Sequence, residues 1–132
     1  SKQWLYRNIK NHIDKNINLK ISLLGLAYKE NTNSIKNSPS IELLNKIKNS
    51  YVKVYDPLVK KINIEEVIIS NSAMESIKNA DILVIATPWE EFRSLDLNQI
   101  KIQMNGNIII DPYKILNEES LKKLNFKYYS IG

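Results

Sequence analysis

The sequence predicts a doubly wound α/β domain, with a mostly parallel sheet covered by helices on both faces. Short apolar runs alternate with stretches of helical spacing along the chain, as in parallel sheets whose strands are joined by helices. The run at residues 81–87, DILVIAT, has an unbroken apolar centre, which is typical of a strand buried on both faces. The 132 residues fit one domain of ordinary size.

The first element predicted is a helix over residues 4–15. Trp4, Leu5, Ile9 and Ile13 fall on one stripe at helical spacing, and the asparagines at 16–18 end the pattern. We expect it to lead into the domain as the end of a connecting helix rather than to join the sheet.

The remaining elements follow as strands and helices in turn. Ser38 is a suitable N-cap and Pro39 a suitable first residue for the helix after the first strand. Predicted strands cover residues 21–24, 52–55, 67–69, 81–87, 107–111 and 126–131, and predicted helices cover residues 39–48, 72–79, 90–104 and 117–124.

Composition excludes several kinds of chemistry. Without cysteine, the chain has no disulfide, thiolate metal ligand or cysteine nucleophile. A single histidine, His12, offers neither a metal cluster nor a nucleophile–base pair, so no catalytic or metal-binding residue is expected. No apolar run approaches the ~20 residues that cross a bilayer, and no secretory signal pattern is present. We therefore expect a cytoplasmic protein without a membrane partner.

The net charge of +5 favours either an anionic partner or a solvated, lysine-rich surface. The 19 basic residues are scattered, without a dense basic run or a known nucleic-acid motif. We therefore expect no nucleic-acid partner.

The segment at residues 21–44 is the strongest candidate for a ligand site. An apolar strand turns at Gly25 into a polar loop with Lys29 and Lys36, and Ser38 then begins a helix. Free backbone N–H groups and the positive end of a helix dipole meet in such an arrangement and attract anions. The loop lacks the three-glycine GxGxxG pattern of dinucleotide sites, so the sequence indicates a phosphate held partly by lysines. The alternative is a loop of solvated lysines.

Acidic residues follow three of the predicted strands, and parallel sheets bind their ligands at such strand ends. Asp56 is either a ribose-binding acid or part of an Asp-Pro turn, and the missing glycine pattern favours the turn. Glu90 and Glu91 are either an acid pair or, by preference, the exposed first turn of a helix. Asp111 closes its strand before Pro112-Tyr113 and is expected beside the same crevice.

Several motifs in order resemble one known family. The segment from Gly25 through Lys29, Thr32 and Ser38-Pro39 to Leu43 resembles the GLAFKxxTDDxRxSPxxxL segment of the UDP-glucose/GDP-mannose dehydrogenases. The later matches, in chain order, are Val54-Tyr55-Asp56-Pro57, Ala80-Asp81, Thr87-Pro88-Trp89-Glu90-Glu91-Phe92 (similar to TxWxEF), Ile110-Asp111 and the ending at 128–132. The resemblance covers residues 19–132 and implies a C-terminal UDP-sugar-binding domain with a Rossmann-like fold.

The resemblance also implies a larger enzyme. Its members join an N-terminal NAD-binding domain, a long central helix and this domain, and are expected to form homodimers. They oxidise the C6 hydroxymethyl of UDP-glucose, GDP-mannose or a UDP-N-acetylhexosamine to a carboxylate, in two NAD-dependent steps through a cysteine thiohemiacetal, for polysaccharide precursors. Residues 1–18 then correspond to the end of the central helix, and NAD is bound mainly by the N-terminal domain.

The site residues implied by the family are transferred one at a time. Tyr28 stands at a phenylalanine position and Lys29 at the family lysine, both on the UDP-sugar side. Lys36 takes the position of an arginine that reaches NAD, although a lysine lacks the bidentate fork. Pro112-Tyr113-Lys114 replaces Gly-Arg-Asn, which leaves Tyr113 and Lys114 as the substrate-side residues.

Two further departures and two alternatives remain at this point. Asn33 and Ser34 replace the usual acidic pair, so the sugar is left open. The alternatives are a stand-alone nucleotide-binding module and a structural dimerisation domain without catalysis.

Overall fold

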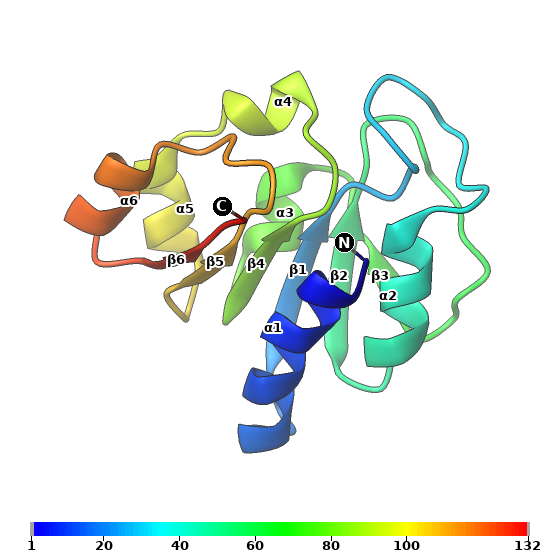
Figure 1. The fold of residues 1–132 in the computed structure, drawn as a ribbon, viewed down its shortest axis with the longest axis horizontal. Coiled ribbons are helices and arrows are strands. Elements are labelled where there is room, and N and C mark those ends of the chain that lie inside the picture. Colours follow the sequence, from blue (N-terminus) through cyan, green and yellow to red (C-terminus); the bar gives the residue numbers. More distant parts are fainter. Residues whose placement is uncertain (1, 132) are drawn as a thin grey trace.

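The computed structural model describes residues 2–131 and contains one six-stranded sheet (Figure 1). The strand order is β3-β2-β1-β4-β5-β6, and every neighbouring pair is parallel. The strands are β1 (Lys20–Leu24), β2 (Tyr51–Tyr55), β3 (Ile68–Ile69), β4 (Ile82–Ile85), β5 (Ile108–Ile110) and β6 (Lys127–Tyr129). The predicted doubly wound fold is confirmed, and the sheet is wholly rather than mostly parallel.

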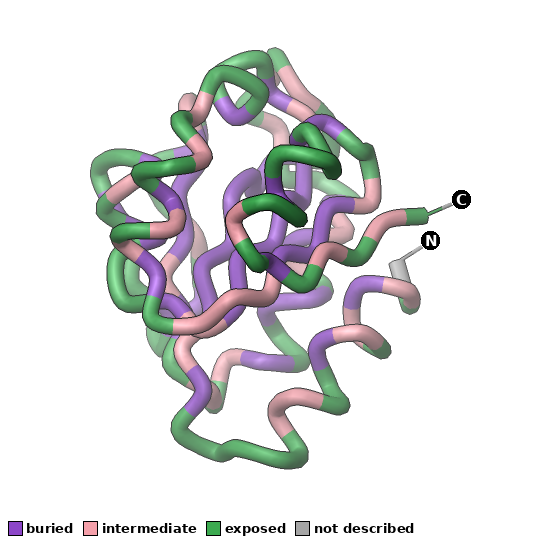
Figure 2. Tube along the Cα trace, turned by 90° about the vertical axis from the view of Figure 1, so that its left-hand side faces the viewer, coloured by how far each residue is buried: buried purple, intermediate pink, exposed green. Residues whose placement is uncertain are grey.

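Helices cover both faces of this sheet. They are α1 (Lys2–Lys15), α2 (Pro39–Ile47), α3 (Ala73–Ile77), α4 (Glu90–Arg93), α5 (Leu97–Gln103) and α6 (Glu118–Lys123). Figure 1 shows α1 and α2 on one side of the sheet, with α3, α5 and α6 on the other. The buried residues in Figure 2 form a continuous centre between these outer layers.

Side chains that point to opposite faces of the sheet divide the interior into two hydrophobic cores, one on each face. In β1, Ile21 and Leu23 pack toward α1 and α2, whereas Leu24 packs toward the other layer. In β4, all four residues are buried because helices cover both faces. The unbroken apolar run in the sequence reflects this double burial.

The predicted helix boundaries have identifiable causes. Ser38 caps α2, since its hydroxyl accepts a hydrogen bond from the Ser40 backbone N–H at 3.2 Å, and Pro39 is the first helical residue. The helix α1 buries Leu5 and Ile9 and ends at Lys15, as predicted.

The prediction of one helical region over residues 90–104 was wrong in one respect. The segment forms two helices, α4 and α5, separated at 94–96. Asp96 begins the second helix because its carboxylate accepts hydrogen bonds from the N–H groups of Asn98 at 2.9 Å and Gln99 at 3.2 Å. A cap inside an apparently continuous helical pattern is the signal that was overlooked.

The direction in which successive strands are added to the sheet reverses between β1 and β4, which are parallel neighbours although β2 and β3 separate them in sequence. Parallel sheets of this kind bind ligands at the carboxyl ends of the strands on either side of such a switch point. The segments following β1, β4 and β5 therefore form the edge at which a site is expected. Within residues 2–131, no helix is long and apolar enough to cross a membrane.

Candidate functional site

The turn after β1 brings two strand ends into close contact. Gly25 has a φ of +105°, and its N–H donates to the Tyr55 carbonyl at 2.8 Å. A Cβ placed on Gly25 would lie 2.0 Å from the Thr87 Oγ1 and 2.8 Å from the Thr87 backbone nitrogen. Only glycine fits both this backbone conformation and this approach to the end of β4.

Asp56 lies at the end of β2 and is only 1% exposed. Its Oδ2 accepts hydrogen bonds from the backbone N–H groups of Leu26 at 2.7 Å and Ala27 at 3.3 Å. Its Oδ1 accepts from the N–H groups of Leu58 and Val59, both at 2.8 Å. The predicted Asp-Pro turn is present, and the same carboxylate also holds the start of the loop after β1.

Tyr28 and Lys29 follow directly after Leu26 and Ala27, the two residues whose N–H groups donate to Asp56. Tyr28 is 44% exposed, and the Lys29 Nζ lies 5.4 Å from the centre of its ring. The Tyr28 N–H donates to the Ser34 carbonyl at 3.0 Å and so closes the loop. Among the described residues, no carboxylate lies within ion-pair distance of Lys29. Its charge is thus available to an anion.

A second buried aspartate organises the loop after β5. Asp111 is fully buried, and its carboxylate accepts hydrogen bonds from the N–H groups of Tyr113 at 3.2 Å and Leu116 at 3.0 Å. The Tyr128 hydroxyl donates to its Oδ2 at 2.7 Å. Lys114 has a φ of +53°, so this loop turns sharply at the substrate-side position implied by the sequence.

The structure brings the loops after β1 and β5 near each other. Burial raises the pKa of the Tyr113 phenol, and the negative charge of Glu30 raises it further. Tyr113 is still 48% exposed. Tyr28 and Lys29 are exposed on the loop after β1, Tyr113 is exposed on the loop after β5, and Lys36 is exposed farther along the loop after β1.

The residues of this chain do not fit a dinucleotide as its main binding site. In dinucleotide folds with this strand order, N–H groups after the first strand meet the pyrophosphate, and an acid after the second binds a ribose. Here the N–H groups of Leu26 and Ala27 are taken by Asp56, and both oxygens of that carboxylate are occupied. This chain therefore does not offer a dinucleotide the usual main-chain and ribose contacts of such folds.

The acid pair at residues 90 and 91 is not a paired site. Both side chains are exposed in the first turn of α4, as the preferred interpretation predicted. Glu91 accepts a hydrogen bond from the Tyr55 hydroxyl at 3.1 Å, and Glu90 lies 3.7 Å from the Arg93 Nε. Burial, and then the Glu91 hydrogen bond, raise the pKa of Tyr55 to about 12.

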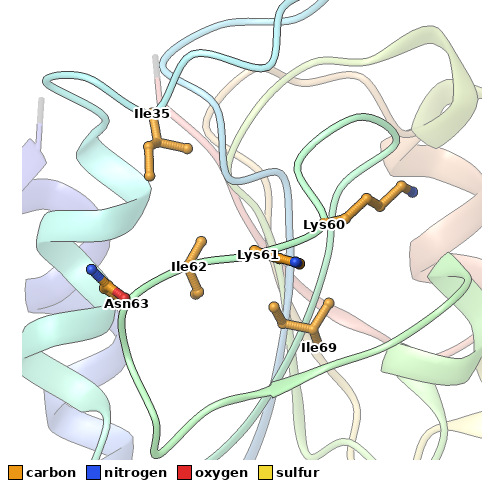
Figure 3. A pocket seen from close by; sticks show the side chains of 6 residues that line it. All are labelled: Ile35, Lys60, Lys61, Ile62, Asn63 and Ile69. Atoms are coloured by element: carbon orange, nitrogen blue, oxygen red, sulfur yellow. The ribbon is translucent and has the colours of Figure 1, made fainter.

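An open hollow of about 510 Å³ lies beside β3, at the far edge of the sheet (Figure 3). Three isoleucines and two lysines surround it, together with Asn63. The six lining residues include none of the predicted ligand residues: they are Ile35, Lys60, Lys61, Ile62, Asn63 and Ile69. Lys60 is engaged elsewhere, since its Nζ donates to the Asp56 carbonyl at 3.2 Å and lies over the Tyr55 ring.

Sequence reasoning missed the way the two aspartates act. The Asp-Pro pairs signalled turns, but nothing in the local pattern showed that Asp56 would reach residues 26 and 27, which are about 30 positions away in the chain.

For residues 2–131, no group of three potential metal-ligating side chains is found.

The wholly parallel sheet, its strand order and the helices on both faces define a Rossmann-like, doubly wound class of α/β domain. The model of the UDP-glucose/GDP-mannose dehydrogenase family, UDP binding domain, matches residues 22–118. The chain belongs to this family and corresponds to its UDP binding domain.

Individual relatives agree with this assignment. The UDP-glucose 6-dehydrogenase of Rickettsia prowazekii is 38% identical over 119 residues, which is 85% of this chain and 27% of the relative. The UDP-N-acetyl-D-mannosamine dehydrogenase of Methanococcus vannielii is 32% identical over 126 residues, covering 89% of this chain and 29% of the relative.

A solved structure shows the same fold. The UDP-D-ManNAc dehydrogenase of Pyrococcus horikoshii superposes with a TM-score of 0.79 and 28% identity, covering 98% of this chain and 30% of that one. The chain thus spans under a third of the length of the dehydrogenases to which it is similar.

Proposed function

We propose that this chain binds the nucleotide sugar in a longer NAD-dependent dehydrogenase, which oxidises the C6 hydroxymethyl of a UDP-sugar to a carboxylate. UDP-glucose and UDP-N-acetylmannosamine are the leading substrates, since relatives acting on each are more than 30% identical to this chain. GDP-mannose is the remaining candidate of the family. This oxidation removes two hydrides in succession and consumes one water, and NAD held by another domain would supply the hydride acceptor for each step.

The observation that carries this proposal is the position of Lys29 on the loop after β1, where no carboxylate of the described residues lies within ion-pair distance of its ammonium group. Lys29 lies beside the exposed ring of Tyr28 on the loop after β1, and Tyr113 is exposed on the loop after β5 at the same edge of the sheet, where ligands bind. A diphosphate next to Lys29 would receive a charge-assisted hydrogen bond, and either tyrosine ring offers a flat surface to a base or sugar.

The other predicted residues have narrower roles in this proposal. Lys114, on the sharply turned loop after β5, is assigned to the substrate side. Lys36 is exposed on the outer part of the loop after β1 and is assigned to a cofactor held by another domain. The helix α1 is assigned to the end of the connecting helix, with the binding domain at residues 19–132.

The test is substitution of Lys29→Ala in the full-length protein. We expect binding of the cognate UDP-sugar to weaken by ~1.5–3 kcal/mol, the range for a hydrogen bond to a charged group, which is roughly ten- to a hundredfold in Kd. Titration calorimetry with UDP-glucose, UDP-N-acetylmannosamine and GDP-mannose measures Kd and also ranks the sugars.

Lys61→Ala is the matched control, because Lys61 is an exposed lysine that lines the hollow beside β3. The proposal expects Lys61→Ala to leave Kd unchanged. An unchanged Kd for Lys29→Ala would refute the proposed site, and weakened binding in Lys61→Ala alone would move the ligand to the hollow.

A further inference from the structure

We propose that Asp56 is a positioning residue, whose buried carboxylate holds Tyr28 and Lys29 in place for the nucleotide sugar. The inference rests on the proposed function, because it requires Lys29 to contact that ligand. It assigns a role in binding to an aspartate that solvent, and therefore the ligand, does not reach.

The geometry of the carboxylate supports this role. Asp56 joins two segments that both leave the ligand edge of the sheet, one through Leu26 and Ala27 and the other through Leu58 and Val59. All four donors are backbone N–H groups, so these bonds fix the path of the main chain. A buried anion satisfied only by main-chain dipoles makes the arrangement rigid, because moving either segment would leave charge without a donor.

The held segment ends directly before the proposed ligand residues. The Leu26 carbonyl also accepts a hydrogen bond from the Ser38 hydroxyl at 2.7 Å, so Leu26 is fixed at both its N–H and its carbonyl. Leu26 and Ala27 are fully buried, whereas Tyr28 and Lys29 are exposed. The buried residue Ala27 is thus followed directly by the exposed residues Tyr28 and Lys29, and Asp56 sets where the Lys29 side chain begins.

Asp56→Asn in the full-length enzyme tests the inference. The amide keeps one acceptor oxygen and turns an NH₂ group toward two of the backbone donors, so one of the two held segments loses its acceptor. We expect the Kd of the cognate UDP-sugar to rise about tenfold. The Kd of NAD should remain unchanged, because the cofactor is bound mainly elsewhere.

A double-mutant cycle with Lys29→Ala separates positioning from general destabilisation. If Asp56 acts through Lys29, the double variant binds about as weakly as Lys29→Ala alone, because the contact is already lost. Additive losses, or a lower Tm with unchanged Kd, would overturn the inference. Asp96→Ala is the stability control, since it removes a helix cap far along the chain and should lower Tm without changing Kd.

The outcomes distinguish this inference from the function on which it rests. Weakened binding in Lys29→Ala with normal binding in Asp56→Asn leaves the proposed function intact and overturns the positioning role. Normal binding in Lys29→Ala refutes the proposed function, and with it any action of Asp56 through Lys29.

Hydrogen exchange of the unmodified enzyme provides a second measurement, which decides the matter even if Asp56→Asn does not fold. Without ligand, the amide hydrogens of Leu26 and Ala27 should already be as protected as those of β1. Adding the UDP-sugar should then slow exchange only beyond Ala27, chiefly at Lys29, because the Tyr28 N–H is already bonded to the Ser34 carbonyl. Fast exchange at Leu26 and Ala27 before ligand is added would contradict a preformed loop.

Discussion

The approach of Gly25 to the end of β4 can be tested by replacing Gly25 with alanine. A Cβ on this residue would lie 2.0 Å from the Thr87 Oγ1, 2.8 Å from its backbone nitrogen and 2.9 Å from its Cβ. The neighbouring backbone cannot easily retreat, since the Ala86 N–H donates to the Leu24 carbonyl at 2.8 Å. A φ of +105° adds strain for any residue with a side chain.

The two costs together give the expected magnitude. Overpacking in a closed interior costs ~1–3 kcal/mol, and an unfavourable backbone conformation costs about the same again. Gly25→Ala should therefore lower the free energy of unfolding by ~2–6 kcal/mol, which at roughly 4 °C per kcal/mol for a chain of this length lowers Tm by about 8 °C or more. Denaturant titration and thermal unfolding followed by circular dichroism measure both quantities.

Thr87→Ala, alone and combined with Gly25→Ala, tests whether the contact with Thr87 causes the loss of stability. Within residues 2–131 the Thr87 hydroxyl is buried without a hydrogen-bond partner, so its removal alone should cost little. In the Gly25→Ala background it removes the shortest contact and should restore ~1 kcal/mol or more. A loss below ~1 kcal/mol for Gly25→Ala, or no recovery in the double variant, would refute the steric argument.

Three further predictions concern stability: the effect of Tyr128→Phe, its pH dependence and the effect of Asp96→Ala. Tyr128→Phe removes a 2.7 Å hydrogen bond to the buried carboxylate of Asp111 and should cost ~1.5–3 kcal/mol in denaturant titration, and a loss under ~0.5 kcal/mol would contradict it. Burial and this hydrogen bond raise the pKa of the Tyr128 phenol above its unfolded value of about 10. The unfolded chain therefore binds fewer protons above that pH, and the stability of the unmodified chain should fall with rising pH more steeply than that of Tyr128→Phe. Asp96→Ala should cost ~1 kcal/mol through the lost cap of α5, and equal unfolding midpoints for the two chains would argue against that cap.

Local signals predicted most of the fold. Ser38 with Pro39 marked the start of α2, and the apolar centre of residues 81–87 marked the doubly buried β4, because capping and double burial act on the residues that carry the pattern. The break at Asp96 was missed since a cap between two short helices differs little from an exposed acid within one long helix.

The site could be predicted only in part, because its organising contacts join distant segments. The sequence pointed to Tyr28, Lys29, Tyr113 and Lys114, and the structure places their two loops at one edge of the sheet. It could not show that Asp56 reaches the loop after β1, since that contact depends on the pairing of β1 with β2.

That contact also explains how a sheet with the strand order of a dinucleotide-binding fold can serve a different ligand. The N–H groups of Leu26 and Ala27, which follow the first strand, already bind an anion, namely the carboxylate of Asp56. An external phosphate would have to displace a buried charge that has four good hydrogen bonds, at a cost larger than the gain. Under the proposed function, a phosphate would instead be bound by side chains farther along the loop, where Lys29 has no ion-pair partner among the described residues. Under the proposed function, the missing glycine pattern and the buried aspartate belong to one arrangement, in which a lysine would take over the phosphate recognition that main-chain N–H groups provide in dinucleotide sites.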